Sequence, residues 1–210
     1  MVVAVSKKVI KIDAPLYLDC NNNCFSACLA MAIHFNRINR KHLQWGGQIS
    51  QDHKDPIWNE ILTSLSDKSA LGTESSFKKI NGRYEKMRKN KGIPLRIREP
   101  KYKLKDASQL SIMLQNNHPP IVLYDLDLYL HNRRGTYFHS ALVTGIDSSH
   151  IYAHDPRLQA DFPFHLDKFK QAWAAKSYKY YLLLPLGTKI EEIVSQQLLD
   201  EYVNATEGGH

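Results

Sequence analysis

The pattern of hydrophobic positions changes near the middle of the chain. Residues 24–35 are apolar on nearly every side of a helix and follow three asparagines, which are preferred N-cap residues, so a buried helix is predicted to begin at Cys24. Other helices are predicted around Ile57–Ser66 and Ser75–Asn90, and a short one between Ala107 and Leu114. Beyond residue 120 the pattern becomes one of short runs rich in β-branched and aromatic residues, which is typical of strands. The predicted strands are Ile121–Tyr124, Tyr137–Ile146, His150–His154 and Tyr178–Leu184.

Helices followed by strands predict an α+β fold, in which a helical first half packs on a C-terminal antiparallel sheet. The segment Gly145–His150 joins two predicted strands and is expected to form a hairpin turn. Because no repeat and no long Pro-, Gly- or Ser-rich linker interrupts the chain, a single domain is predicted over residues 1–187. A capping box at Thr188–Glu191 predicts an amphipathic helix, so residues 188–210 are expected to be this helix and a flexible tail.

Composition and cysteine usage narrow the class of protein. The chain has 210 residues, 43% of them hydrophobic and 23% charged, which is typical of an ordinary globular protein. No apolar run approaches the roughly 18 residues of a membrane span, and lysines interrupt the N-terminal segment where a secretory signal would be apolar. A cytoplasmic location is therefore expected, with signal-independent export left open. Cys20, Cys24 and Cys28 are odd in number and tightly clustered, which does not indicate a disulfide framework.

Positive charge is concentrated in one part of the sequence. The net charge is +7, and the segment Lys78–Lys105 contains 12 of the 28 lysines and arginines but only two of the 21 acidic residues. Such a block could bind an acidic partner, although a solvated helix and loop surface is the favoured explanation. Nucleic acid is not an expected partner, because the sequence has no nucleic-acid-binding motif.

The strongest candidate for chemistry is Cys24, at the start of the predicted buried helix. Helix N-terminal amides and the helix dipole favour a thiolate over a thiol. A thiolate nucleophile also needs a general acid/base and a group that orients it, and His139 and Asp155 at the two ends of the predicted hairpin could supply these. A turn centred on Asp147 would place both on one face of the sheet. A two-residue turn at Ser148–Ser149 would place them on opposite faces unless a bulge intervened.

Two blocks of sequence resemble a known family. The segment Asn23–Met31 resembles the helix-opening motif of the papain-like peptidases that process bacteriocin leaders after a double glycine, and of their wider domain family. Tyr137–Asp147 and Ile151–Pro156 resemble the His strand and the Asp-Pro strand of that family in spacing and order. The resemblance implies a papain-like fold, a peptide or protein substrate, and Cys24, His139 and Asp155 as nucleophile, general acid/base and orienter.

The sequence departs from the family pattern at two places. Phe25 follows the cysteine where the family usually has glycine. The oxyanion-hole glutamine of the family lies five or six residues before the cysteine, where this chain has Leu18 and Asp19. An ionised Asp19 would oppose the developing oxyanion, and Asn21 is an alternative side-chain donor beside the Cys24 backbone N–H.

The clustered cysteines also raise the question of a metal site. A zinc site built from the clustered cysteines with His34 and His42 is disfavoured, because the spacing leads into a hydrophobic helix without a second ligand pair. No metal or other cofactor is therefore expected.

The favoured hypothesis is a thiol hydrolase of peptide or isopeptide bonds that acts through a thioacyl intermediate. Glutamine deamidation or acyl transfer by the same triad, and a non-catalytic peptide-binding module, remain open.

Overall fold

A computed structural model describes residues 10–17, 23–52, 54–66, 74–100, 108–189 and 193. The candidate oxyanion residues Asp19 and Asn21, and Cys20, lie outside these ranges. Apart from residues 188, 189 and 193, so do the predicted C-terminal helix and tail. None of the helices in the described part of the chain is long and apolar enough to cross a membrane.

The helical first half and the strand-rich second half are both present. The first half contains α1 (Cys24–Asn39), α2 (Pro56–Leu65), α3 (Glu74–Lys91) and α4 (Ser108–Gln115). The described strands are all antiparallel and form one sheet in the order β2-β7-β3-β4-β5-β6, with β1 pairing on β4. The bounds of the strands are β1 Ile10–Lys11, β2 Leu95–Arg98, β3 Ile121–Tyr124, β4 His139–Ile146, β5 His150–His154, β6 Phe162–His165 and β7 Tyr180–Pro185. The predicted α+β class is confirmed.

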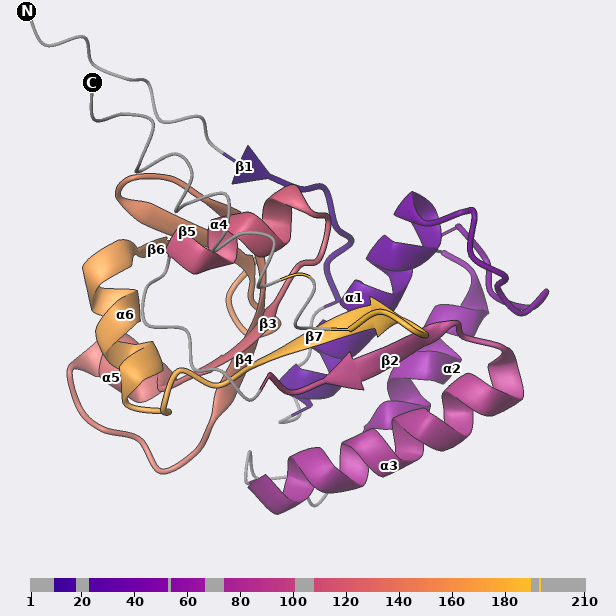
Figure 1. Ribbon diagram of the computed structural model, residues 1–210. Coiled ribbons are helices and arrows are strands. Elements are labelled where there is room, and N and C mark those ends of the chain that lie inside the picture. The colour runs from indigo at the N-terminus through magenta and orange to yellow at the C-terminus, as the bar shows by residue number, and fades with distance from the viewer. Residues whose placement is uncertain are drawn as a thin grey trace, which may run out of the picture.

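Two hydrophobic cores lie on opposite faces of the sheet, as the alternation of side chains along a strand requires. In β4, Leu142 packs in the core under α1, α2 and α3, whereas Val143 packs in the core under α4, α5 (Leu126–His131) and α6 (Leu166–Ala174). Figure 1 shows α1, α2 and α3 on one side of the strands and α5 and α6 on the other. Residues 24–36 of α1 are all buried, which explains why their sequence is apolar on nearly every side.

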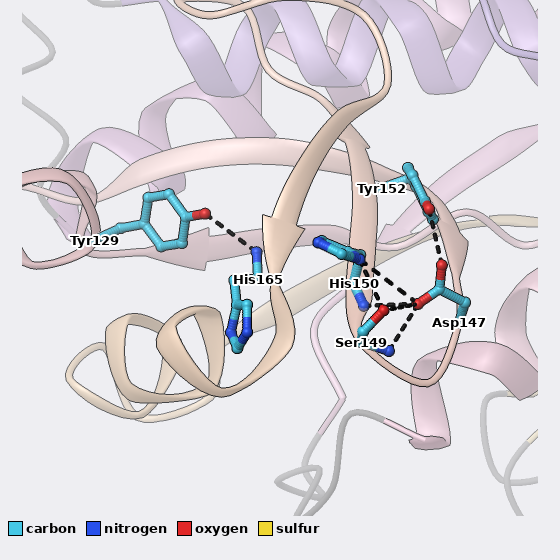
Figure 2. Close-up of polar contacts among 6 residues, drawn as sticks. All are labelled: Tyr129, Asp147, Ser149, His150, Tyr152 and His165. Atoms are coloured by element: carbon cyan, nitrogen blue, oxygen red, sulfur yellow. Dashed lines mark hydrogen bonds and ion pairs between the residues drawn. The ribbon is translucent and has the colours of Figure 1, made fainter.

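The hairpin between β4 and β5 closes with a two-residue turn. Ile146 pairs with Ile151, and the backbone N–H of Asp147 donates to the carbonyl of His150 at 2.9 Å, so Ser148 and Ser149 form the loop. The Asp147 carboxylate accepts the backbone N–H groups of Ser149 and His150, both at 2.7 Å, and the hydroxyl of Tyr152 (Figure 2). These bonds lower the pKa of Asp147 to about 2, the largest contribution coming from Ser149, and they fix the turn in place.

A β-bulge in β4 changes the register beyond the turn. Gly145 pairs with Tyr152, but Val143 pairs with Ala153, so Thr144 is an extra residue in β4. Its carbonyl accepts the N–H of Ile12 at 2.7 Å. The shift by one residue reverses which side chains share a face, so His139 and Asp155 come to lie on the same face. The observed hairpin is thus the two-residue alternative, corrected by a bulge.

A buried histidine joins the helical half to the sheet. His118 precedes β3, is 8% exposed, and lies 3.0 Å through Nδ1 from the guanidinium of Arg40, the C-cap residue of α1. Burial, with a smaller effect of Arg40, lowers the pKa of His118 to about 4.

This pKa predicts acid sensitivity. Between pH 6.5 and about 4 the unfolded chain binds a proton at His118 that the folded chain does not, so stability falls as the pH falls through that window. We expect the His118→Gln variant to lose about 3 kcal/mol less folding free energy than the unchanged protein when the pH falls through this window. Urea unfolding of both proteins at pH 7 and pH 4.5 measures it. Equal losses in the two proteins would contradict the prediction.

Candidate active site

Three elements converge at the candidate site: the first turn of α1, the start of β4 and the residue after β5. Cys24 is the first residue of α1, and Asn23 is its N-cap, as predicted. The Asn23 side chain makes no capping hydrogen bond to the first turn, and that turn contains no acidic residue. The positive end of the helix dipole therefore acts on Cys24 without a neutralising carboxylate in the same turn.

His139 and Asp155 form a buried hydrogen-bonded pair. Nε2 of His139 lies 2.9 Å from both carboxylate oxygens of Asp155, and the two side chains are 7% and 0% exposed. With the register of Val143 and Ala153 continued, Asp155 lies opposite Ala141, two residues from His139 on the same face. Such diagonal neighbours are within reach of long side chains. The bulge thus allows the contact.

The Asp155 carboxylate is held by several donors. It accepts the backbone N–H groups of Arg157 and Leu158 at 2.8 and 3.0 Å and the Tyr124 hydroxyl at 2.5 Å, besides His139. Burial raises the pKa of a carboxyl group, but the interactions with His139, the Tyr124 hydroxyl and the Arg157 N–H outweigh it, so the pKa of Asp155 is lowered. Asp155 is therefore an anion, which a buried carboxylate can be only when its oxygens are well paired.

Cys24 and His139 lie close enough for each to shift the pKa of the other. Because Asp155 occupies Nε2, Nδ1 is the ring nitrogen left to face the thiol. Burial disfavours the thiolate, but the positive charge of His139 and hydrogen bonds from His139 and Ser140 outweigh it and lower the pKa of Cys24. Burial likewise disfavours the imidazolium, but the negative charge of Cys24 and the hydrogen bond to Asp155 raise the pKa of His139 to about 10. Both shifts favour a pair of thiolate and imidazolium over the neutral pair.

Sequence analysis did not identify Ser140 or Tyr124 as parts of this site. Ser140 follows His139 in β4 and is fully buried; its hydroxyl has no hydrogen-bond partner among the described residues, but Ser140 is one of the groups that lower the pKa of Cys24. Tyr124 pairs with His139 across β3 and β4, and their rings meet edge to face with centroids 5.4 Å apart. The alternation of side chains in β4 could have placed Ser140 toward α1, but nothing local indicates the contact with sulfur.

The structure brings Cys24, His139 and Asp155 together, and their catalytic roles remain predictions. Cys28 lies one turn further along α1, fully buried, and neither described cysteine is in a disulfide. Within the described ranges, no group of three or more His, Cys, Asp or Glu side chains could hold a metal ion.

Comparisons with known proteins identify the fold. No protein-family description and no curated protein matches the sequence. Among solved structures, a protein from Bacillus anthracis described as a C39-like peptidase matches 86% of this chain and all of its own, with 14% identity and a TM-score of 0.53. A double glycine motif protease from an AMS/PCAT transporter, solved in complex with the leader peptide, matches 83% of this chain and 94% of its own, with 12% identity. Its TM-score of 0.47 is too low to support an argument. The chain has the papain-like fold of a C39-like peptidase, which confirms the predicted fold; at this identity the likeness concerns the fold alone.

The contact of Ser140 with Cys24 predicts how the thiol titrates. Ser140→Ala removes a hydroxyl that favours the thiolate, so the pKa of Cys24 should rise by about one pH unit. The rate of Cys24 alkylation by iodoacetamide, followed against pH by peptide mapping, gives this pKa as its midpoint. Ser26→Ala is the matched control, because the buried Ser26 hydroxyl donates to the Leu65 carbonyl at 2.8 Å instead. An unchanged midpoint in Ser140→Ala would argue against the contact.

The hydrogen bond from Tyr124 to Asp155 predicts a difference between two buried tyrosines. Tyr124→Phe leaves the carboxylate short of a donor and should lower the free energy of unfolding at neutral pH by about 1–3 kcal/mol. Tyr180→Phe is the control, since the Tyr180 hydroxyl is buried without a hydrogen-bond partner in the described structure, and its removal should cost nothing. Urea denaturation measures both variants. The prediction fails if they lose equal stability.

Proposed function

We propose that the protein is a cysteine hydrolase that cleaves a peptide or isopeptide bond with Cys24 as nucleophile, His139 as general acid/base and Asp155 as the residue that orients His139. The observation that carries the proposal is the buried cluster in which Cys24, at the start of α1, lies beside His139, and His139 is hydrogen-bonded to Asp155. The peptidase fold supports the same class of activity.

In the proposed mechanism, the Cys24 thiolate attacks the carbonyl carbon and the carbonyl oxygen becomes an oxyanion. The Cys24 backbone N–H at the start of α1 is one donor to that oxyanion. The imidazolium of His139 gives its Nδ1 proton to the leaving amine, the C–N bond breaks, and a thioester remains on Cys24. Neutral His139 then takes a proton from water as the water attacks the thioester, which releases the acid and restores the thiolate. Asp155 keeps Nε2 protonated throughout.

Two features of the site favour charge separation before substrate binds. The pKa of Cys24 is lowered and that of His139 is raised, and both shifts favour the thiolate–imidazolium pair over the neutral pair. The side chains are enclosed, with Cys24 only 9% exposed, and this low-dielectric setting strengthens their interaction. Deamidation of glutamine or acyl transfer would use the same thioester, with ammonia as leaving group or an amine in place of water.

One sequence feature favours a different function, that of a peptide-binding module without catalysis. Leu18 and Asp19 stand where the resembled family has its oxyanion glutamine, and efficient hydrolysis needs a second donor from Asn21 or another side chain.

The cytoplasmic location of the protein and an acidic partner for the segment Lys78–Lys105 also remain proposals. On α3 this segment presents exposed basic residues, namely Lys78, Lys79, Arg83, Lys86 and Lys89.

Turnover of a peptide pool tests the proposed function. The protein should cleave members of a mixed peptide pool, detected by mass spectrometry, and Cys24→Ala should abolish the cleavage. His139→Ala should slow it by about 10²- to 10⁴-fold, the usual contribution of a general acid/base. Cys28→Ala should leave it unchanged. If Cys24 reacts readily with iodoacetamide near neutral pH but no peptide is cleaved, another acyl acceptor or donor is indicated; if Cys24 reacts no faster than Cys28, the protein is not a thiol hydrolase.

A further inference from the structure

An aromatic cluster lies beside the two residues that carry the proposed chemistry. Phe25 directly follows Cys24 in α1 and packs edge to face against Phe77 and Tyr181, with ring centroids 4.9 and 5.1 Å apart. Phe77 in turn contacts Phe138, the residue before His139, at 5.8 Å. We call these four residues the aromatic cluster. Through it, α1, α3, β7 and the start of β4 meet next to the candidate site.

A small pocket opens over this cluster. Its inner lining is formed by Phe25, Phe77 and Tyr181, which are 3%, 6% and 7% exposed, together with the half-buried Ile97 of β2. The other lining residues, Lys78, Asn81 and Glu99, are exposed and border its mouth. The pocket has a volume of about 80 Å³. One water needs about 10–15 Å³ of such space, so the pocket has room for roughly five waters or for a short branched side chain.

We propose that this pocket is a specificity subsite for an aliphatic side chain, such as leucine, of the peptide substrate. The inference rests on the proposed function and adds the kind of residue that the substrate must carry near the scissile bond. The inner lining is aromatic and the polar residues border the mouth, so an apolar side chain gains from burial against Phe25, Phe77 and Tyr181. Lys78 and Glu99 have opposite charges at the mouth, so the pocket offers no net charge to attract an acidic or a basic side chain.

Its position limits where on the substrate that side chain lies. Phe25 is adjacent to Cys24 in the chain and Phe138 is adjacent to His139, so two members of the aromatic cluster are direct chain neighbours of candidate-site residues. An extended peptide advances about 3.3–3.6 Å per residue, so the side chain that enters the pocket belongs to a residue close to the scissile bond. Phe25 replaces the glycine of the resembled family, and the pocket is therefore built partly from a residue that distinguishes this chain.

A scan of blocked pentapeptides tests the subsite. Five peptides place one leucine at each position of an otherwise all-glycine chain, and each is assayed for how far it slows iodoacetamide alkylation of Cys24. We expect one or two of the five to slow alkylation at least about threefold at concentrations where the all-glycine peptide has no effect, a small part of what burying leucine can supply. The same peptides with glutamate or lysine in place of leucine should not protect.

Two tryptophan variants connect protection to the pocket. Asn81→Trp places a large side chain at the mouth of the pocket and should abolish the difference between leucine and glycine peptides. Lys79→Trp is the matched control, because Lys79 is equally exposed on α3 but does not line the pocket. Two residues apart on a helix, these positions face different directions. Both variants change exposed positions, so folding should not be affected.

The outcomes separate this inference from the proposed function. The subsite is overturned if Cys24 is reactive but no leucine peptide protects better than glycine, or if Asn81→Trp leaves the protection intact. The proposed function is overturned, with the subsite retained, if leucine peptides protect Cys24 and Asn81→Trp removes the effect while no peptide, including those that protect, is cleaved. In that case the pocket supports peptide binding without hydrolysis.

Discussion

The register of the β4–β5 hairpin is the constraint on which the candidate site depends. A tight turn at Ser148–Ser149 alone would place His139 and Asp155 on opposite faces of the sheet. The extra residue Thr144 shifts the pairing by one position and brings both side chains to one face. The Thr144 hydroxyl donates to Asp161 at 2.7 Å and its carbonyl binds Ile12, so contacts from outside the hairpin hold the bulge in place.

The buried charges of the site impose a second requirement. Asp155 is fully buried, and an isolated carboxylate there would be strongly disfavoured. Two backbone N–H groups, the Tyr124 hydroxyl and the ring of His139 satisfy it. The same carboxylate favours the imidazolium form of His139, which in turn favours the thiolate of Cys24. The hydrogen bonds to Asp155 thus support, through His139, the charge that acts directly on Cys24.

The fold places the helix start against the sheet so that these groups meet. α1 is buried from Cys24 to Asn36, and its core contacts with β3, β4 and β7 fix its position over the sheet. The aromatic cluster occupies the adjacent space, where Phe25 contacts both α3 and β7. A glycine at position 25 could make none of these contacts. The departure from the family pattern at this position is therefore part of how this chain packs its helices beside the candidate site.

The sequence by itself determined the elements whose pattern is strong and local. The apolar run after Asn23 predicted α1 from its first residue, and the β-branched runs predicted β3 and β5 with their observed bounds. It missed β1, β2, α5, β6 and α6. β1 has two residues and α5 six, too few for a period to show, whereas α6 has nine and is longer than the predicted α4, so length does not explain its omission. It also extended β4 back to Tyr137, although that residue is 52% exposed and the strand begins at His139.

The site divides in the same way. Cys24, His139 and Asp155 were identifiable from residue type, order and resemblance, because their chemistry is carried by the residues themselves. The tertiary structure alone decided that a bulge puts His139 and Asp155 on one face, that Tyr124 donates to Asp155, and that Ser140 contacts Cys24. These are contacts between elements distant in the chain. Register and packing are set by the sum of many weak interactions across the whole sheet, and no local pattern records that sum.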